Sequence, residues 1–181
     1  MCIIWMMRFC KQPALSTATR EILKHPNECL RRTSEPVVCF DDQLAILAAV
    51  LENTMRSGPG GVGIAAPQIG ENVRLVVVDC RQSKRSCCNH GLLYMANPHI
   101  EYAEGEAFGR EGCLSVPDWV GTVPRSEIIR VSYDNVRGEP CNLESNGFEA
   151  RVIQHEIDHL DGILFVDRVV STRGLIRRLG A

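Results

Sequence analysis

Apolar residues recur along positions 41–55 at the spacing of one face of an α-helix. The recurring positions are Leu44, Leu47, Ala48, Leu51 and Met55. Asp41 and Asp42 come first, where acidic side chains favour the N-terminus of a helix. The pattern therefore predicts an amphipathic helix over residues 41–55 whose apolar face lies in the core.

Shorter apolar runs bounded by turn residues predict β-strands. These runs cover residues 73–79, 92–96, 99–103, 128–133 and 140–143. Asn97-Pro98 separates the second run from the third, and residues 135–138 predict a turn between the last two. An extended segment that turns at Pro26 is expected over residues 22–26.

A second helix is predicted near the end of the chain. One stripe of it carries Phe148, Val152, His155 and His159. Asn146, with Glu149 three residues later, has the pattern of an N-cap, and Gly162 suits the C-terminal stop.

This helix contains the pattern H-E-x-x-H at residues 155–159. Residues four apart lie one turn apart on the same face, so His155 and His159 can bind one metal ion together. Glu156 is then placed to take a proton from a water on that ion. The alternative is a surface helix with two half-buried histidines, but the spacing of the pair, with glutamate after the first, favours a metal site.

A catalytic site of this kind needs a third protein ligand and one open position. The longer motif H-E-x-x-H-x-x-G-x-x-H would need histidine where the chain has Phe165, and no glutamate follows Glu156. The carboxylates beyond Glu156 are Asp158, Asp161 and Asp167. We therefore expect the third ligand upstream, and the nine cysteines are candidates.

The length of 181 residues suits one domain with its own hydrophobic core. The net charge of −2 gives no sign of bulk attraction to nucleic acid or to a membrane, and no apolar run reaches transmembrane length. Nine cysteines without a repeated spacing indicate reduced thiols in a cytosol-like compartment rather than a disulfide framework.

The two ends of the chain stand apart from this pattern. Residues 1–19 contain basic side chains but no acidic one, and we expect a flexible extension there. Residues 20–181 are then expected to form a single catalytic domain. The tail beyond Val166 is expected to be a solvated helix face that carries Arg168, Arg173, Arg177 and Arg178.

Two loops contain patterns that resemble binding sites. The loop over residues 81–91 holds Cys87, Cys88 and His90, for which a variable surface loop is favoured over a second metal site. Residues 58–63 match G-x-G-x-x-G, but that dinucleotide fingerprint follows a strand and opens a helix, whereas here a predicted helix precedes it and a strand follows. These glycines are expected to bring bare backbone close to a ligand such as an extended peptide, with Gln68 on the same wall.

Three stretches together resemble the motifs of peptide deformylases. Residues 61–68 read GVGIAAPQ and resemble G-x-G-x-A-A-x-Q. Residues 111–115 read EGCLS, and residues 154–159 match Q-H-E-x-D-H. The three occur in the order of that family, and the resemblance covers about residues 20–170.

The resemblance implies an α+β fold in which antiparallel sheets pack around the H-E-x-x-H helix. The implied activity is removal of the formyl group from N-formylmethionine at the start of new polypeptides. Cys113 would be the third metal ligand beside His155 and His159. The expected ion is Fe(II), with zinc, nickel or cobalt as replacements.

The implied mechanism gives roles to three further residues. The metal would lower the pKa of a water from about 15.7 towards ~7, and Glu156 would accept its proton and later protonate the leaving amine. The Gln68 side-chain amide and the Leu114 backbone N–H would stabilise the oxyanion of the tetrahedral intermediate.

Substrate contacts follow from the same resemblance. Gly61 and Gly63 would hold the substrate backbone as an added strand, and Val62, Phe148 and Val152 would line an apolar pocket for methionine. Arg151 interrupts the apolar run expected on that wall. Arg125 is expected to be a structural ion-pair partner, with Glu111 as the candidate acid.

The implied partner is a nascent formylmethionyl polypeptide, with the ribosome as a second candidate, and neither a nucleic-acid motif nor a membrane contact is expected. The expected location is the bacterial cytosol, with an organelle as the alternative. An endopeptidase is disfavoured because no downstream third ligand and no second lobe exist. A structural zinc module would need four protein ligands and would leave Glu156 without a role.

Overall fold

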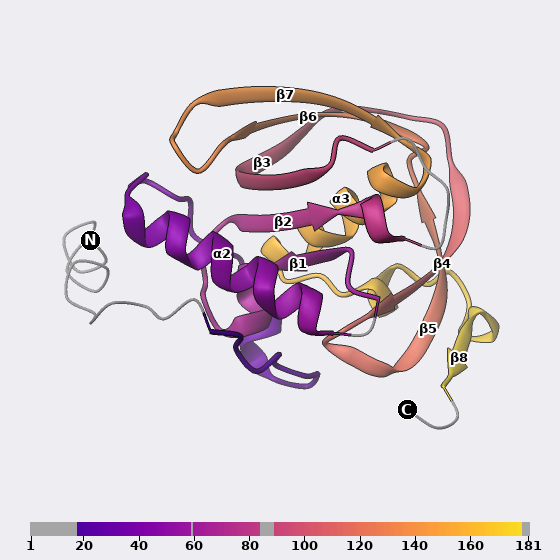
Figure 1. The fold of residues 1–181 in the computed structure, drawn as a ribbon. Coiled ribbons are helices and arrows are strands. Elements are labelled where there is room, and N and C mark those ends of the chain that lie inside the picture. Colours follow the sequence, from indigo (N-terminus) through magenta and orange to yellow (C-terminus); the bar gives the residue numbers. More distant parts are fainter. Residues whose placement is uncertain (1–17, 59, 84–88, 179–181) are drawn as a thin grey trace.

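The computed structural model describes residues 18–58, 60–83 and 89–178. Within them the chain forms two antiparallel sheets and two α-helices, joined by short 3₁₀ segments (Figure 1). The larger sheet has the strand order β1-β2-β3-β6-β7, and the smaller has the order β4-β5-β8. The expected α+β class with antiparallel sheets is confirmed.

The bounds of the strands are β1 Gly63–Ala65, β2 Leu75–Asp79, β3 Leu92–Glu104, β4 Ala107–Cys113, β5 Val116–Arg125, β6 Ile128–Asp134, β7 Pro140–Asn146 and β8 Leu175–Arg177. The α-helices are α2 Asp42–Ser57 and α3 Gly147–Leu160. The 3₁₀ segments are η1 Glu28–Arg31, η2 Ala66–Ile69, η3 Cys80–Gln82, η4 Phe165–Arg168 and η5 Thr172–Gly174.

Helix α2 forms as its sequence predicts and begins one residue later. The Asp41 carboxylate caps it by accepting hydrogen bonds from the backbone N–H groups of Gln43 and Leu44, at 3.0 and 3.1 Å. Its apolar face packs on one side of the larger sheet, against Leu75 and Val77 of β2.

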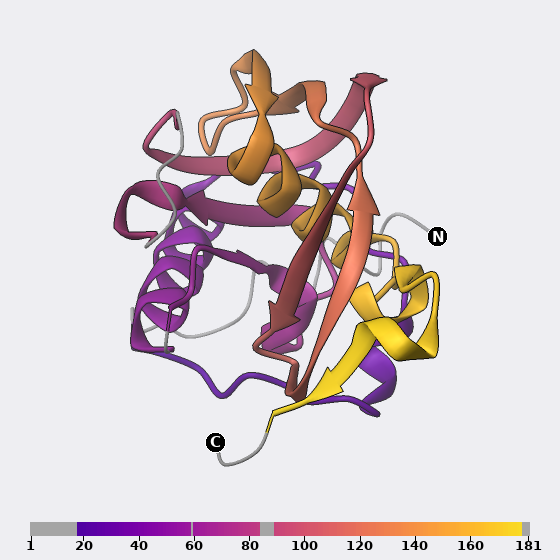
Figure 2. The ribbon, with the colours of Figure 1, turned by 90° about the vertical axis from the view of Figure 1, so that its right-hand side faces the viewer.

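The other side of the larger sheet is covered by α3. Strand β2 is buried along its whole length, because Val76 and Val78 face α3 while their neighbours face α2. The two helices therefore sandwich the β1–β2 end of this sheet. Figure 2 shows α3 passing between the larger sheet and the long strands β4 and β5 of the smaller one.

The ends of α3 differ in part from the predicted capping. Asn146 is the N-cap residue, but its side chain makes no capping hydrogen bond. Glu149 instead turns inward, is fully buried, and accepts hydrogen bonds from Ser145 Oγ and His90 N, both at 2.8 Å. Gly162 follows the C-terminus at a positive φ of 73°, and a Cβ there would lie 2.5 Å from the Arg31 carbonyl oxygen. Glycine is therefore required at this stop.

The two strands predicted over residues 92–103 are one strand, β3. Its pairing with β6 shifts register between Ala96 and His99, so the Asn97-Pro98 step interrupts the ladder without ending the strand. Asn97 has a φ of 51°, and its side-chain amide is held by Val37, with Val37 N to Asn97 Oδ1 at 2.8 Å. The predicted turn between β6 and β7 is confirmed, with Gly138 N donating to Asn135 O at 2.9 Å.

The smaller sheet is the part of the fold that the sequence did not predict. Its strands β4 and β5 pair over residues 107–125 in a stretch with several glycines and prolines. The prediction of a solvated helix after Val166 is wrong, because Leu175–Arg177 forms strand β8 on the edge of β5. Arg168 is not freely solvated either, since its guanidinium pairs with Asp158.

Some predictions fall on residues outside the described part of the chain. Almost all of the expected extension over residues 1–19 does so, and so do Cys87 and Cys88. The glycine-rich loop follows α2 and leads into strand β1, which agrees with the rejection of a dinucleotide site.

Candidate metal centre and active site

Three potential ligands converge between α3 and the end of β4. His155 and His159 lie one turn apart on α3, and Cys113 is the last residue of β4, where the pairing with β5 changes register. One ligand atom from each of the three lies within 4.8 Å of the others, and all three residues are buried. The Cys113 Sγ atom lies 3.2 Å from His159 Nε2. Side chains from two distant segments thus meet at one point.

The imidazole ring of His155 is oriented by its surroundings. His155 Nδ1 lies 2.9 Å from Glu111 Oε2, so a proton on Nδ1 is donated to the carboxylate and Nε2 keeps a lone pair for another partner. Phe165, which stands where the longer motif would have histidine, stacks on the His155 ring with centroids 6.2 Å apart. The Nδ1 atom of His159 is buried without a hydrogen-bond partner among the described residues.

The residues fit a divalent transition metal. Burial alone would raise the pKa of the Cys113 thiol, but the imidazoles of His159 and His155 outweigh it and hold that pKa well below its usual range. A thiolate and two imidazoles are the ligand types that zinc, iron, nickel and cobalt accept. The Glu111 carboxylate behind His155 is the kind of partner that fixes a metal-binding histidine.

Glu111 is itself held by two arginines. Its Oε1 atom accepts hydrogen bonds from Arg125 Nε at 2.9 Å and from Arg151 Nη1 at 2.8 Å, and its Oε2 atom accepts one from Arg125 Nη2 at 3.0 Å. Burial would raise the pKa of Glu111, but hydrogen bonds from His155 and Arg125 outweigh it and lower that pKa to about 2. The expected Arg125–Glu111 ion pair is confirmed.

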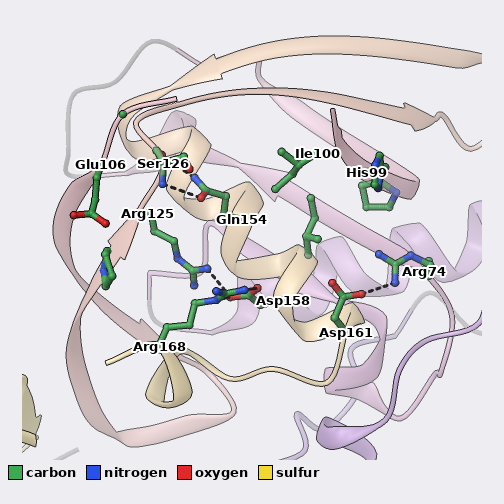
Figure 3. Close-up of a pocket in the computed structure, with 14 residues that line it drawn as sticks. Arg74, His99, Ile100, Glu106, Arg125, Ser126, Gln154, Asp158, Asp161 and Arg168 are labelled. Carbon is green, nitrogen blue, oxygen red and sulfur yellow. Dashed lines mark hydrogen bonds and ion pairs between the residues drawn. The ribbon is translucent and has the colours of Figure 1, made fainter. Parts of the chain in front are cut away.

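The chain of ion pairs continues to the far side of α3. Arg125 also pairs with Asp158, and Asp158 pairs with Arg168, whose Nε lies 2.6 Å from Asp158 Oδ2. Arg125, Asp158 and Arg168 line a cavity of about 430 Å³ on that side of the helix, and the Arg74–Asp161 pair also lines it (Figure 3). Alternating charges therefore connect the metal centre to the opposite face of the helix.

Glu156 points into the site from the residue next to His155. It is 4% exposed, its Oε2 atom has no hydrogen-bond partner among the described residues, and burial raises its pKa to about 7. A Cβ at Gly63 would lie 2.4 Å from Glu156 Oε1, so only glycine lets strand β1 pass this close to the carboxylate. A carboxyl group with a pKa near neutrality can both accept and return a proton.

Gln68 presents its amide nitrogen to the same centre. Its Oε1 atom accepts a hydrogen bond from Ala65 N at 2.8 Å, which leaves Nε2 directed at Ser115 Oγ, 3.1 Å away, and at Cys113 Sγ, 3.6 Å away. The side chain is 2% exposed. A hydrogen-bond donor is thus fixed in place beside the three ligand atoms.

A cavity of about 490 Å³ opens onto this centre. Ten of the eleven predicted site residues line it, and the remaining one, His159, lies beneath at 1% exposure. The ten are Gly61, Val62, Gly63, Gln68, Cys113, Leu114, Phe148, Val152, His155 and Glu156. Gly61 has a packing reason of its own, because a Cβ there would lie 2.3 Å from Met55 O at the end of α2.

Comparison with known proteins gives the same picture. The sequence model of the polypeptide deformylase family matches residues 19–174. A peptide deformylase of Desulfotalea psychrophila is 40% identical over 86% of this chain and 90% of that protein. Peptide deformylase 1 of Bacillus cereus is 44% identical over 84% of this chain and 93% of that protein.

The chain belongs to the peptide deformylase family.

Solved structures of peptide deformylases share the fold. The enzyme of Legionella pneumophila matches with a TM-score of 0.78 and 40% identity, covering 87% of this chain and 89% of that one. A class I type b peptide deformylase from Acinetobacter baumannii with Met-Ala-Ser bound matches with a TM-score of 0.80 and 36% identity, covering 85% of this chain and 100% of that one.

The activity of this chain follows from its membership of the peptide deformylase family. It is a metal-dependent hydrolase that removes the formyl group from the N-terminal formylmethionine of new polypeptides. In the described residues, Cys113, His155 and His159 form a group that could hold the metal ion. No helix in the described part of the chain is long and apolar enough to cross a membrane.

Sequence reasoning missed two features of this deformylase site. Glu111 was expected to pair with Arg125, but its contact with His155 was not predicted. Arg151 was seen only as an interruption of an apolar wall, whereas its guanidinium turns away to Glu111 and to the Val123 carbonyl oxygen at 2.9 Å. The spacing of Arg151 four residues before His155 was the signal, since both then reach the same carboxylate.

Proposed function

We propose that Cys113, His155 and His159 hold one divalent ion and that the residues around it carry out the deformylase reaction. The ion, when bound, would polarise a water and the formyl carbonyl and make proton loss from the water easier near neutral pH. The observation that carries the proposal is the convergence of three ligand atoms within 4.8 Å beside Glu156 and Gln68 in a single cavity.

Glu156 moves the proton in this mechanism. Its carboxylate accepts a proton from the attacking water, and the same carboxyl group returns a proton to the leaving amine of the methionine. The two transfers leave Glu156 in its starting state. Burial supports both transfers, because it brings the pKa of Glu156 to about 7.

Gln68 and Leu114 stabilise the negative charge that develops on the formyl oxygen. Gln68 Nε2 is already oriented by the bond between its Oε1 atom and Ala65 N, so little reorganisation is needed at the moment of reaction. The Leu114 backbone N–H is the second donor, from the residue that follows Cys113.

The methionine side chain enters the apolar part of the cavity. Val62, Phe148 and Val152 line it, and each also packs against the core of the larger sheet, which makes the wall rigid. Gly61 and Gly63 offer backbone to the substrate as an added strand. Arg151 does not present an uncompensated charge to the pocket, since Glu111 and two carbonyl oxygens bind its guanidinium.

Formate release from formyl-Met-Ala-Ser by metal-replete protein tests this function. Acetyl-Met-Ala-Ser and casein are the matched negative substrates, because an endopeptidase would cleave casein and a structural zinc module would act on none of the three. Release of formate with a new free amino terminus on methionine is the expected result.

Fe(II) is the proposed ion, with zinc, nickel or cobalt as replacements. An iron next to a thiolate is sensitive to oxygen, and Cys113 itself can be oxidised along the sulfenic-to-sulfonic series. The iron form should be most active and decay in air, nickel or cobalt forms should persist, and a zinc form should be stable but slow. Equal, air-stable kcat/KM values for iron and zinc forms would contradict the choice of iron.

The remaining proposals concern the setting of the enzyme. Residues 20–181 form the catalytic domain, and residues 1–19 are an extension that catalysis does not need. The bacterial cytosol is the proposed location, supported by the bacterial origin of the related proteins, with an organelle as the alternative. The ribosome is a second proposed partner because the substrate is a nascent chain.

A further inference from the structure

Two exposed arginines stand at the mouth of the substrate cavity. Arg110 lies on β4 and Arg178 follows β8, and both line the cavity that contains Cys113. Residues 108, 110 and 112 of β4 are exposed, whereas Glu111 and Cys113 between and beyond them are buried. Arg110 is therefore on the outward face of the strand whose inward face carries the metal centre.

The Arg178 guanidinium lies directly against the backbone of Gly112. A Cβ at Gly112 would lie 2.3 Å from Arg178 Nη2 and 3.3 Å from Val120 Cγ1. The tail is held in this position by strand β8 and by a hydrogen bond from Arg178 N to the Asp118 carbonyl oxygen at 2.8 Å. The positive charge of Arg178 is thus held against Gly112, the residue that precedes Cys113.

These two charges lack the compensation that the deeper arginines have. Among the described residues, neither Arg110 nor Arg178 takes part in an ion pair. In the part of the chain that the structure describes, the carboxylates that line the cavity are Glu111 and Glu156, both buried, and Glu111 is already bound by Arg125 and Arg151. The mouth of the cavity therefore has an excess of positive charge.

We propose that Arg110 and Arg178 form a cationic rim at the mouth of the cavity. This rim selects formylated peptides that have an acidic residue at position two or position three, counting the formylmethionine as position one. The proposal rests on the proposed function, since a peptide whose methionine fills the cavity must leave through this mouth. Glutamate or aspartate there meets two free guanidinium groups, whereas lysine or arginine meets like charge.

The size of the preference follows from the exposure of the rim. Exposed ion pairs are weak and are screened by salt, so two of them should raise kcat/KM for an acidic peptide about three- to tenfold at low ionic strength. The preference should fall towards one at about 0.5 M salt, where the Debye length is only a few ångströms.

The test compares glutamate with its uncharged isostere. Formate release is measured on formyl-Met-Glu-Ala-amide against formyl-Met-Gln-Ala-amide, and on formyl-Met-Ala-Glu-amide against formyl-Met-Ala-Gln-amide. The C-terminal amides remove the terminal carboxylate. The variants are the double substitution R110Q/R178Q and the control R177Q, which removes the same charge from the neighbouring exposed residue outside the cavity.

The expected result is a Glu/Gln ratio of kcat/KM of about three to ten at one or both positions in wild type and in R177Q, and near one in R110Q/R178Q. A ratio near one in wild type, or a ratio unchanged in R110Q/R178Q, overturns the rim and leaves the deformylase function standing. Absence of formate release from every peptide contradicts the proposed function instead. The Kd values of the same peptides, measured by calorimetry, then test the cationic rim independently: the Gln/Glu ratio of Kd should be about three to ten in wild type and R177Q and near one in R110Q/R178Q.

Discussion

Replacing Glu111 by glutamine tests how the metal centre is held. The substitution keeps the size of the side chain and removes its charge. In the wild-type protein the carboxylate accepts four hydrogen bonds, from Arg125 Nε and Nη2, Arg151 Nη1 and His155 Nδ1. An amide has one oxygen and one NH₂ group, so at least one of the arginines would face a donor instead of an acceptor.

The cost follows from the burial of this cluster. The side chains of Glu111, Arg125 and Arg151 are 5%, 3% and 8% exposed, so the two guanidinium groups would lose their shared counter-ion inside the protein. Removing one partner of a buried ion pair costs about 3–5 kcal/mol. For a protein of this size, this lowers the melting temperature by about 6–20 °C. Loss of the partner behind a metal-binding histidine should also weaken metal affinity about 10–100-fold.

The pKa of Glu111 gives a second estimate of what its ionised carboxylate contributes to the stability of the fold. The pKa of Glu111 is lowered from 4.5 to about 2, which by linkage corresponds to about 3 kcal/mol. Because the folded-state pKa lies below the unfolded one, this stabilisation is fully present above pH ~5 and is lost as pH falls towards 2. The stability difference between wild type and Glu111→Gln should therefore be constant from pH 7 to 5 and shrink below that.

Thermal and urea unfolding of both proteins, metal-free and metal-replete, measure these effects. Glu144→Gln is the matched control, since Glu144 is exposed on β7, and it should change stability by less than about 0.5 kcal/mol. If Glu111→Gln melts within about 1 °C of wild type and keeps its metal affinity, the two arginines do not depend on this carboxylate, and the account of the centre is wrong.

Three further outcomes are expected. Glu156→Ala should keep the metal and lose at least about 10²-fold in kcat, because it removes the proton carrier but no ligand; formate release near the wild-type rate would refute that role. Gln68→Ala should lower kcat about 10²–10³-fold, and steady-state kinetics showing a change in KM alone would argue against an oxyanion donor. Deletion of residues 1–19 should leave melting temperature and kcat/KM unchanged, because it keeps Arg20, whose N–H binds Thr54 Oγ1 and whose guanidinium pairs with Glu71; a large fall in melting temperature would show that the extension packs on the domain.

The local sequence pattern predicts those helices and strands whose apolar residues recur at a regular spacing. Helix α2 has apolar residues at every turn and a carboxylate at its cap, and both survive in the structure. The sequences of strands β4 and β5 show no such period, because β4 contains the adjacent charged residues Arg110 and Glu111 between two glycines and β5 contains two prolines. The two strands are consecutive and pair with Cys113 opposite Val116, but residues 113–116 do not carry the Asn-Gly or Asp-Gly turn that marks a hairpin in a sequence.

The residues of the site also differ in how far the sequence predicts them. The pair His155 and His159 follows from helix geometry alone, and the choice of Cys113 among nine cysteines came only from the family resemblance. The spacing of Arg151 places it on the same face of α3 as His155, but it does not tell where the guanidinium lies, because a long side chain can line a pocket with its stem while its charged end lies elsewhere. Only the structure relates it to Glu111, which is 40 residues away along the chain.

The central claim is that a metal ion held by Cys113, His155 and His159 is required for deformylation by this chain. The most direct measurement is kcat/KM for formate release from formyl-Met-Ala-Ser by the Fe(II)-loaded protein, kept free of oxygen, for wild type and Cys113→Ser. The account predicts rapid release by wild type that stops on chelation and returns with Fe(II), and a loss of both bound metal and activity in the variant. Full metal content and full activity in Cys113→Ser, or no formate from the iron-loaded wild type, would contradict it.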